Sequence, residues 1–333
     1  MRIAIVKLSA LGDIVHAMVV LQFIKNFDSQ ISIDWIVEDS FKDILSNHPH
    51  IDQIYVVNLR NAKQKKSIIC LFKELIKIKK LNHYDLVIDL QGLIKSALIA
   101  RLVSSDKTIG FDKFSIREKF ASFFYSNTFN LAYSKNVVER NISLICFALG
   151  IRVDKEQIKN KLPFLHSCSS SLGVMSSNGK KDIILISGGS KNSKLYPAEK
   201  FAELSSLIDA NFYITWGNEK EKMIAKEVKS LAPKVKILND NSLSNLVSLI
   251  SQSNLIIGAD TGPTHMAWAL NIPSITLYGS TPGYRNSYVT DINKIIESHS
   301  IVDPLKINHK DYSIREIDVN QISSVAKEIL DLT

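Results

Sequence analysis

Short apolar runs alternate with segments of helical periodicity along most of this sequence, and this alternation restricts the fold more than any other feature. In the first half, apolar runs with the length of buried strands occupy residues 2–7, 32–37, 54–57 and 85–89. Helices are predicted where apolar residues recur every three or four positions, from residue 14 and over residues 68–81, 95–103 and 137–149. Strands that alternate with helices indicate βαβ units and a mostly parallel sheet.

The alternation stops between residues 166 and 181, a serine-rich stretch with two glycines and no long apolar face. Such a composition is typical of an inter-domain linker, and 333 residues are enough for two domains. Beyond it, strands are predicted at residues 182–187, 212–216, 235–237, 255–258 and 274–278, and helices at residues 197–208, 219–231, 243–252, 263–270 and 319–330. We therefore expect two doubly wound α/β domains that face a cleft, residues 1–165 and 182–312, and a closing C-terminal helix within residues 313–333.

The composition excludes several classes of protein. With 45% hydrophobic and 22% charged residues, the chain is typical of globular proteins and not of disordered or fibrous ones. The apolar stretch at residues 14–24 contains a histidine and a glutamine and is too short to span a bilayer, and we expect no secretory signal. Cys70, Cys146 and Cys168 have neither metal-ligand nor disulfide spacing, so we expect a reducing cytosol and no metal site.

Positive charge is concentrated in the first half of the chain. Residues 1–165 hold 24 Lys and Arg against 16 Asp and Glu, whereas residues 166–333 hold 17 of each. The densest cluster has Glu74 as its single acid and consists of Arg60, Lys63, Lys65, Lys66, Lys73, Lys77, Lys79 and Lys80. Such a cluster either is a solvated face or favours a polyanionic partner, such as a nucleic acid, an anionic membrane or a phosphorylated substrate.

The predicted helix at residues 68–81 carries Ile68, Phe72, Leu75 and Ile76 on one side and lysines on the other. Two interpretations are open for it. In the first, the apolar side packs on the sheet, as in any amphipathic helix of a globular domain. In the second, the helix rests on an anionic membrane surface, where each basic residue contributes about 1 kcal/mol.

Ligands of doubly wound sheets bind beyond the carboxyl ends of strands, so the loops after the predicted strands are the candidate sites. In the first such loop, Gly12 allows a tight turn and Asp13 follows it. Asp13 is either the N-cap of the next helix or a general base that faces the cleft. Gln91, which follows the strand at residues 85–89, is either part of a turn or a hydrogen-bonding group of the site, and Lys95 comes shortly after it.

Two loops of the second domain have the residues of a phosphate site. After the strand at residues 182–187, glycines and serines expose backbone N–H groups, and Lys194 adds a positive charge that suits a diphosphate. After the strand at residues 255–258, the N–H groups of Thr261 and Gly262 begin a helix and favour an anion. Asp260 fits there only if it caps the loop or holds a hydroxyl group, and His265 is expected to be a core or loop residue.

Two acids, Glu219 and Glu221, begin the helix that is predicted after Trp216 and Gly217. Acids in the first turn of a helix are stabilised by its dipole, which is sufficient to explain them. In the alternative interpretation, one of the two holds the diol of a ribose.

Five segments occur in a specific order between residue 1 and about residue 281: KLSALGDIVHA, VIDLQGLIKSALIARL, SIREKFASFFY, WGNEKE and GADTGPTHMAWALNIPSITLYGST. Together they resemble the bacterial lipopolysaccharide heptosyltransferases, glycosyltransferase family 9. The resemblance implies a GT-B fold of two Rossmann-like domains, the first for the acceptor and the second for the donor, with the C-terminal helix packed back on the first. The stretch VIDLQGLIKSA favours the enzymes that add the first heptose over those that act later.

The resemblance further implies an inverting transfer of heptose from ADP-heptose to a Kdo hydroxyl of Kdo–lipid A, at the cytoplasmic face of the inner membrane and without a metal or other cofactor. It assigns catalysis to Asp13, as the base, and to Lys194. It assigns donor binding to Ser187, Gly188, Lys194, Trp216, Gly217, Glu221 (or Glu219), Asp260, Thr261, Gly262 and His265. It assigns acceptor binding to Ser9, Gly12, Arg60, Lys63, Gln91, Lys95 and Arg117.

The sequence departs from the family pattern at three places: the Gly-Gly-Ser-Lys run ahead of Lys194, Asn136, and a shorter loop after Thr281. These departures concern the details of donor contact and not the class of enzyme. A later heptosyltransferase, or another sugar-nucleotide enzyme of this fold such as an epimerase, is the alternative. A nucleic-acid-binding module is disfavoured, because the basic cluster has no interleaved aromatic residue beyond Phe72.

Overall fold

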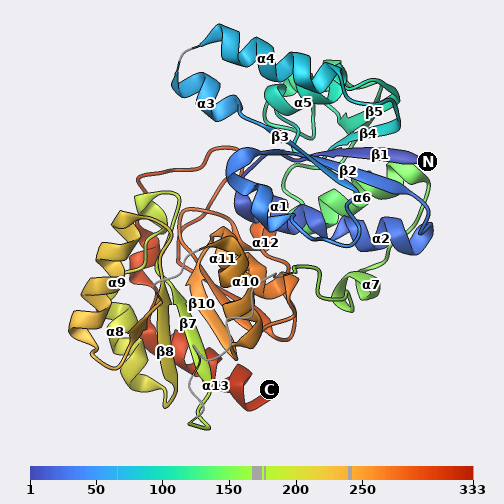
Figure 1. The fold of residues 1–333 in the computed structure, drawn as a ribbon. Coiled ribbons are helices and arrows are strands. Elements are labelled where there is room, and N and C mark those ends of the chain that lie inside the picture. The colour runs from blue at the N-terminus through green and yellow to red at the C-terminus, as the bar shows by residue number, and fades with distance from the viewer. Residues whose placement is uncertain (66, 167–174, 176–177, 239–241, 333) are drawn as a thin grey trace. The chain divides into compact units, whose positions relative to one another are not determined.

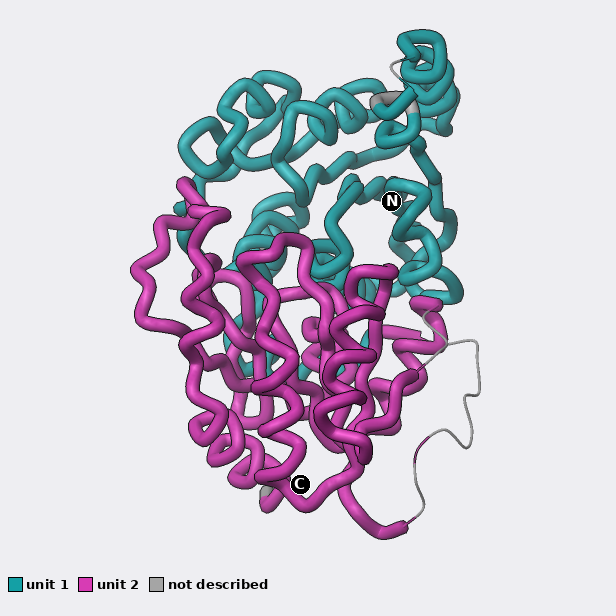
Figure 2. The backbone as a smooth tube through the Cα atoms, turned by 90° about the vertical axis from the view of Figure 1, so that its left-hand side faces the viewer, with its two compact units in different colours: residues 1–164 teal, residues 165–333 magenta. Residues whose placement is uncertain are grey.

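The structure is a computed structural model that describes residues 1–65, 67–166, 175, 178–238 and 242–332. The chain divides into two compact units, Met1–Phe164 and Leu165–Thr333 (Figure 2). Each unit has its own sheet. This division falls next to the expected end of the first domain at residue 165. Most of the predicted linker lies outside the described residues, and so does Cys168.

The first unit is built on six parallel strands in the order β3-β2-β1-β4-β5-β6 (Figure 1). The strands are β1 (Arg2–Val6), β2 (Ser32–Glu38), β3 (Gln53–Val57), β4 (Tyr84–Asp89), β5 (Ser105–Phe111) and β6 (Asn127–Phe129). The helices are α1 (Leu11–Met18), α2 (Val20–Phe27), η1 (Asp39–Ile44), α3 (Leu59–Gln64), α4 (Ile68–Lys79), α5 (Ile94–Leu102), η2 (Lys119–Phe124), α6 (Val137–Leu149) and α7 (Lys155–Lys159). Figure 1 shows α4 and α5 on one face of this sheet and α1, α2 and α6 on the other.

The second unit is also built on six parallel strands, in the order β12-β11-β10-β7-β8-β9. The strands are β7 (Asp182–Ile186), β8 (Asn211–Thr215), β9 (Lys236–Ile237), β10 (Leu255–Ala259), β11 (Ser274–Tyr278) and β12 (Asn293–Glu297). The helices are η3 (Asn192–Lys194), α8 (Ala198–Leu207), α9 (Glu219–Leu231), α10 (Leu243–Gln252), α11 (Gly262–Ala269), α12 (Gly283–Asn286), η4 (Ser313–Glu316) and α13 (Val319–Leu332).

Both sheets have the same strand order when the strands are counted within their own unit: 3-2-1-4-5-6. This is the order of the Rossmann fold, in which the chain reverses its direction of winding between the first and fourth strands. The register confirms the neighbours, because Ile5 of β1 pairs with Ile88 of β4, and Ile257 of β10 pairs with Leu185 of β7. Ligands of such sheets bind at the carboxyl ends of these central strands, so the loops after β1, β4, β7 and β10 are the places to examine.

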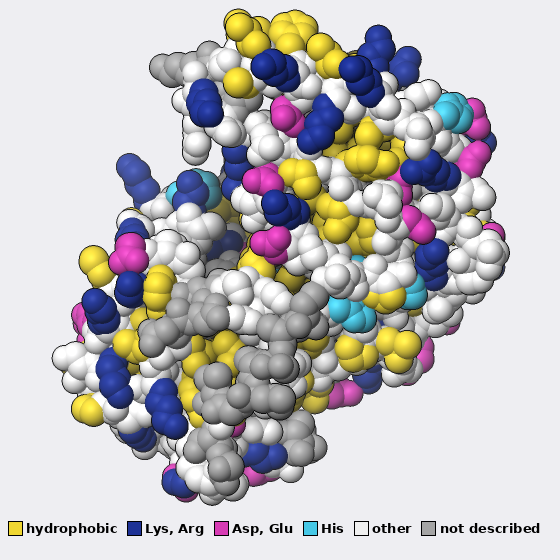
Figure 3. All heavy atoms as spheres, in the orientation of Figure 1, with side chains coloured by type: hydrophobic (Ala, Val, Ile, Leu, Met, Phe, Trp, Pro, Cys, Tyr) yellow, Lys and Arg dark blue, Asp and Glu magenta, His cyan; other side chains and the backbone are white. Residues whose placement is uncertain are grey.

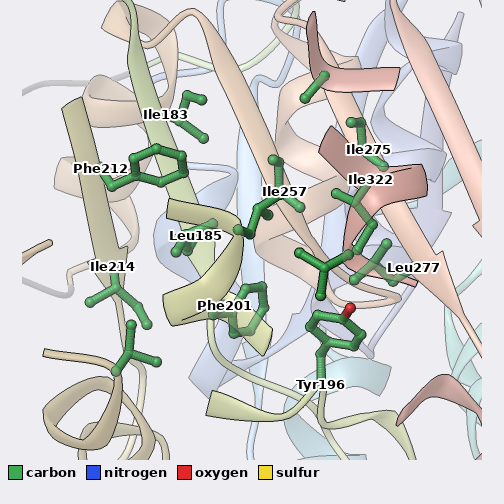
Figure 4. Close-up of a cluster of buried hydrophobic side chains, with 14 of the residues drawn as sticks. Ile183, Leu185, Tyr196, Phe201, Phe212, Ile214, Ile257, Ile275, Leu277 and Ile322 are labelled. Atoms are coloured by element: carbon green, nitrogen blue, oxygen red, sulfur yellow. The ribbon is translucent and has the colours of Figure 1, made fainter. Parts of the chain in front are cut away.

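The core of the second unit lies between its sheet and the helices on one face (Figure 4). Alternate residues of the central strands point into it and are buried: Ile183, Leu185, Phe212, Ile214, Ile257, Ile275 and Leu277. Phe201 of α8 and Ile322 of α13 pack against them. Parallel strands that are covered on both faces consist of continuous apolar runs, which is why the sequence identified most of them.

The C-terminal helix α13 belongs to this second core. Ile322, Ala326 and Ile329 recur at helical spacing, are fully buried, and lie in the same cluster as the strands, while α13 packs against α8. The apolar face of α13 is therefore covered by the second unit, and the expected packing of this helix on the first domain stays a prediction. An apolar stripe of this length has to be covered, and the face of the second sheet covers it.

Candidate active site

The loop after β1 is tied to the loop after β4 at the carboxyl edge of the first sheet. The side-chain oxygen of Gln91 accepts hydrogen bonds from the N–H groups of Leu8 (2.7 Å) and Ser9 (3.3 Å), and Nζ of Lys95 donates to Oγ of Ser9 (3.3 Å). Gly92 turns the chain here with a φ of 69°, the left-handed region that favours glycine. The structure therefore brings together Ser9, Gln91 and Lys95, three of the residues that were assigned to the acceptor.

Asp13 lies in the first turn of α1, just beyond the carboxyl end of β1. Ala10 is the N-cap residue, so the interpretation of Asp13 as the N-cap is wrong. Asp13 is exposed, and its Oδ2 accepts a hydrogen bond of 3.3 Å from the N–H of Ala10. Gly12 lies inside the helix and not in a turn before it, so the tight turn predicted at Gly12 is also wrong. An exposed carboxylate at this edge of the sheet is accessible to a ligand, which leaves open the interpretation of Asp13 as a general base.

Asp89, the last residue of β4, is a buried carboxylate that the sequence analysis did not single out. It accepts hydrogen bonds from the N–H groups of Gln91 (2.8 Å) and Gly92 (3.2 Å) and from the hydroxyls of Ser96 (2.8 Å) and Tyr125 (2.7 Å). Burial raises the pKa of Asp89, and these hydrogen bonds oppose the rise. Asp89 therefore fixes the loop that carries Gln91. Its one signal in the sequence is an acid at the end of the apolar run DLVID.

Glu38, the last residue of β2, is a second buried acid that the sequence analysis missed. Its N–H donates to the carbonyl of Leu8 (3.2 Å), and the residue is 2% exposed. Burial raises the pKa of Glu38, while the N–H of Arg60 and the positive charges of Lys95 and Arg60 oppose the rise. Glu38 thus lies near Arg60 and Lys95, two of the residues that were assigned to the acceptor.

Arg60 and Arg117, two further residues assigned to the acceptor, are exposed on the surface of the first unit. Arg60 is in α3, with its guanidinium carbon 4.9 Å from the centre of the Phe41 ring. Lys63 is in the same helix, but its side chain lies outside the described part of the chain. Arg117 is exposed in the segment before η2.

Replacing Gln91 with methionine tests the link between the two loops. We expect the free energy of unfolding to fall by about 1–3 kcal/mol, because the N–H groups of Leu8 and Ser9 lose their acceptor while the side chain keeps its volume. Gln157→Met is the control, since Gln157 also accepts a backbone hydrogen bond, from Asp154 (2.9 Å), but on an exposed helix. Equal urea-unfolding midpoints for the two variants would show that Gln91 does not hold the loop.

Lys194 and Asp260 form a buried ion pair at the carboxyl edge of the second sheet. Nζ of Lys194 lies 2.5 Å from Oδ2 of Asp260 and donates to its main-chain carbonyl at 3.2 Å. Lys194 ends η3, in the connection after β7, and Asp260 directly follows β10, so the two neighbouring strands place them together. The lysine side chain is 17% exposed and the aspartate side chain is 8% exposed.

Asp260 is also the centre of a hydrogen-bond network. Its Oδ1 lies 3.0 Å from Nε2 of His265, and its Oδ2 accepts from Oγ1 of Thr281 (2.8 Å) and Nδ2 of Asn286 (3.2 Å). Burial by itself raises the pKa of Asp260, but the charge of Lys194 and the hydrogen bond and charge of His265 outweigh it and hold the pKa well below its ordinary value. Asp260 therefore joins the loops after β10 and β11, and His265 is buried beside it as expected.

Helix α11 begins at the same edge of the second sheet. Thr261 is its N-cap, and Gly262 and Pro263 are its first residues, one position earlier than the helix predicted from residue 263. The first N–H groups of a helix have no partner within it, and the helix dipole makes them attractive to an anion. Lys194 adds a cation to this edge. Among the described residues there is no group of three or more His, Cys, Asp or Glu placed to hold a metal ion.

Of the two candidate acids at the start of α9, Glu221 is the one turned toward the sheet. Its Oε2 accepts a hydrogen bond from the N–H of Gly217 (2.7 Å), and a Cβ atom on Gly188 would lie 2.8 Å from its carboxylate. Glu219 is instead 82% exposed and pairs with Lys222 at 3.3 Å. The structure therefore brings together Gly188, Gly217 and Glu221, and it places Glu219 on the surface.

Two other residues that were assigned to the donor have structural partners. Oγ of Ser187 is buried and donates to the carbonyl of Thr215 (2.7 Å), which ties the end of β7 to β8. The ring of Trp216 packs partly buried beside the second core, with Nζ of Lys222 4.5 Å from the ring centre. Both residues border the edge where Gly188 and Glu221 meet.

The network around Asp260 predicts a specific acid sensitivity. A folded-state pKa below the ordinary value of 3.8 means that the ionised carboxylate stabilises the fold above that pH. The contribution is lost as the pH falls through the folded-state pKa, because the unfolded chain binds the proton first. We therefore expect the free energy of unfolding, measured with urea at pH 6 and below pH 4, to fall less between the two pH values for Asp260→Asn than for the unchanged protein. Parallel losses would show that Asp260 carries no such stabilisation.

Comparison with known proteins identifies the class. The family model of glycosyltransferase family 9 (heptosyltransferase) matches residues 72–304. Lipopolysaccharide heptosyltransferase 1 of Campylobacter coli is 40% identical over 345 residues, which cover 99% of each chain. The Salmonella typhimurium protein of the same name is 30% identical over 86% of this chain and 92% of its own. Among solved structures, E. coli heptosyltransferase WaaC with ADP-2-deoxy-2-fluoro heptose has a TM-score of 0.79 at 24% identity, covering 98% of this chain and 99% of that one.

The fold and the site therefore define a glycosyltransferase of the GT-B type, with two Rossmann-like units, and the predicted fold class is confirmed. Within that class, the chain belongs to glycosyltransferase family 9, the heptosyltransferases. The family assignment that the sequence motifs suggested is confirmed by the same comparisons.

Proposed function

We propose that the protein transfers L-glycero-D-manno-heptose from ADP-heptose to a Kdo hydroxyl of Kdo–lipid A, with inversion at the anomeric carbon. The observation that carries the proposal is the 40% identity to lipopolysaccharide heptosyltransferase 1 of C. coli over 99% of both chains. Lipopolysaccharide heptosyltransferase 3 of E. coli is only 25% identical over 81% of each chain, which favours the enzyme that adds the first heptose. A nucleotide-sugar donor is supported by the E. coli WaaC structures with ADP and with an ADP-heptose analogue.

In this proposal the second unit binds the donor. The diphosphate accepts hydrogen bonds from Nζ of Lys194 and from the N–H groups of Thr261 and Gly262, where the helix dipole adds to the attraction. These groups stabilise the negative charge that grows on the phosphate oxygen as the bond to the heptose breaks. Glu221 accepts hydrogen bonds from the ribose diol, since its carboxylate lies at the same sheet edge.

The first unit binds the acceptor and supplies the base. Asp13 takes the proton of a Kdo hydroxyl as that oxygen forms the new bond to the anomeric carbon. The bond from this carbon to ADP breaks on the opposite face, so the configuration inverts and ADP leaves with the electron pair. Ser9, Gln91 and Lys95 hold the loop that leads to Asp13, as their hydrogen bonds show.

The surface around Arg117 suits an acceptor that is both anionic and lipidic. Phe114, Phe120 and Phe123 in the same segment are 70%, 71% and 76% exposed. A cation among exposed rings fits the carboxylate and phosphate groups of Kdo–lipid A on one side and its acyl chains on the other. Arg60 and Lys63 are assigned to further acidic groups of the same acceptor.

The location and the cofactor requirement follow from these assignments. Kdo–lipid A is held in a bilayer, so the enzyme is proposed to act peripherally at the cytoplasmic face of the inner membrane. Within the described part of the chain, none of the helices has the length and apolar character needed to cross a membrane.

Because Lys194 and the start of α11 neutralise the leaving ADP, we expect activity with no divalent metal and no other cofactor. We propose no nucleic-acid partner.

The test is incubation with ADP-heptose and Kdo–lipid A in the presence of a chelator, with ADP release and product mass as readouts. A mass gain of one heptose, with equal release of ADP, is the expected result. Donor binding without product on Kdo–lipid A, but with product on a heptose-bearing core, would identify a later heptosyltransferase instead. Failure to bind ADP-heptose would overturn the proposal.

A further inference from the structure

Helix α4 presents its apolar stripe to solvent and not to the core. Ile68, Phe72 and Ile76 are four residues apart and share one face, and they are 70%, 60% and 52% exposed. Ile69, next to this stripe, is 70% exposed, whereas Ile78 is the buried residue of the helix. A helix on a sheet normally turns such a stripe inward, so this one has the reverse orientation. Of the two interpretations that the sequence left open, packing of this stripe on the sheet is therefore wrong.

Specific contacts on the inner side of α4 fix this orientation. Ile78 lies in the core cluster of the first unit. Oε2 of Glu74 accepts a hydrogen bond from the N–H of Asn58 (3.1 Å), and Nζ of Lys77 donates to the carbonyl of Val56 (2.6 Å). These contacts hold the inner side of the helix, so α4 cannot turn its stripe inward without breaking them.

Exposed cations border the stripe. Lys73, Lys79 and Lys80 are exposed, and the acid of the helix, Glu74, is directed inward to Asn58. The space-filling view shows hydrophobic side chains over α4 with Lys and Arg side chains beside them (Figure 3). An apolar stripe bordered by lysines is typical of helices that lie in the headgroup region of a bilayer. Protein–protein interfaces, by contrast, are depleted of lysine.

We propose that the outward face of α4 is a membrane-docking surface. Ile68, Ile69, Phe72 and Ile76 insert at the boundary between headgroups and acyl chains, and Lys73, Lys79 and Lys80 bind anionic headgroups. The partner is an anionic lipid bilayer, because its charge complements the lysines and its interior accepts the stripe. None of the residues of this surface is among those assigned to transfer, so the proposal goes beyond the proposed reaction and assigns the contact that brings the enzyme to a lipid-anchored acceptor.

Binding of the full-length protein to vesicles tests the proposal, with sedimentation as the readout. The vesicles are pure phosphatidylcholine or phosphatidylcholine mixed with phosphatidylglycerol. We expect the unchanged protein to bind the mixed vesicles. The affinity for these vesicles should fall about tenfold or more in Ile68→Asn/Phe72→Asn, and about fivefold in each of the single variants Lys73→Gln and Lys79→Gln. The control is Leu231→Asn/Leu305→Asn, which removes two exposed apolar side chains (53% and 56%) from the second unit and should bind as the unchanged protein does.

Three results would overturn the proposal: no binding to either vesicle, equal binding to both kinds, or equal loss in the control and the α4 variant. Binding of the basic surface to RNA at physiological salt, without vesicle binding, would identify a nucleic-acid surface instead.

Transfer assays test separately whether this surface acts in membrane docking or in the reaction itself. Ile68→Asn/Phe72→Asn should keep its turnover on a water-soluble, deacylated Kdo acceptor and lose it on vesicle-embedded Kdo–lipid A. Loss on both acceptors would count against docking as the role of the stripe.

Discussion

Asp13→Ala is expected to lower turnover by about 10²–10⁴-fold while the affinity for ADP-heptose stays nearly unchanged. The carboxylate is exposed at the carboxyl end of β1, and in the proposed mechanism it takes the proton of the attacking hydroxyl. Donor binding is assigned to the second unit, so it should not depend on this residue. Single-turnover ADP release and titration with ADP-heptose measure the two quantities separately.

Asp13→Asn is the matched control for this prediction. Its amide oxygen can still accept the hydrogen bond from the N–H of Ala10, so the first turn of α1 keeps its contact. It cannot take a proton at neutral pH. Both variants should therefore be equally slow if Asp13 is the base. An asparagine variant with nearly full turnover would show that Asp13 only supports the start of the helix.

Lys194→Met is expected to reduce transfer by about 10²–10³-fold, because the leaving diphosphate loses a positioned cation. The substitution has a second effect, since it leaves the carboxylate of Asp260 buried without its ionic partner. Breaking a buried ion pair by removal of one member costs about 3–5 kcal/mol. A loss of activity alone would therefore not separate catalysis from folding.

The double variant Lys194→Met/Asp260→Asn separates the two effects. Removing both charges avoids the uncompensated carboxylate, so the unfolding midpoint should recover toward that of the unchanged protein. Activity should stay low, because the cation that faces the diphosphate is still missing. Recovery of activity together with stability would show that Lys194 acts only through the fold.

The central strands of both sheets could be predicted from the sequence, and several outer strands could not. β1, β4, β7 and β10 are buried apolar runs, and each lies within one residue of its predicted bounds. β5 begins with the half-buried Ser105 and the exposed Asp106 and Lys107, and β6 is only three residues long, so neither has a continuous apolar run. These segments form strands because they pair with a neighbouring strand, and such long-range pairing cannot be predicted from the local sequence pattern.

The positions of the candidate site residues could be predicted, but their partners could not. The loops after β1, β4, β7 and β10 were identified because strand ends in a parallel sheet carry ligands. Thr281, in the loop after β11, and Asn286, in α12, join Asp260 from 21 and 26 residues further along the chain. Glu38 and Asp89 were missed because a single acid at the end of an apolar run resembles a strand terminus. For α4, periodicity located the apolar stripe but not the direction in which it faces.

The identical strand order of the two sheets has a consequence for how the chain is made. All strands of the first sheet lie before residue 130, and all strands of the second lie after residue 181. Once the first half of the nascent chain has left the ribosome, every strand of the first sheet is therefore available for folding. Since domains fold as units during synthesis, the first sheet can form before translation of the second sheet begins. The outward stripe of α4 is then available to a bilayer while the rest of the enzyme is still being synthesised.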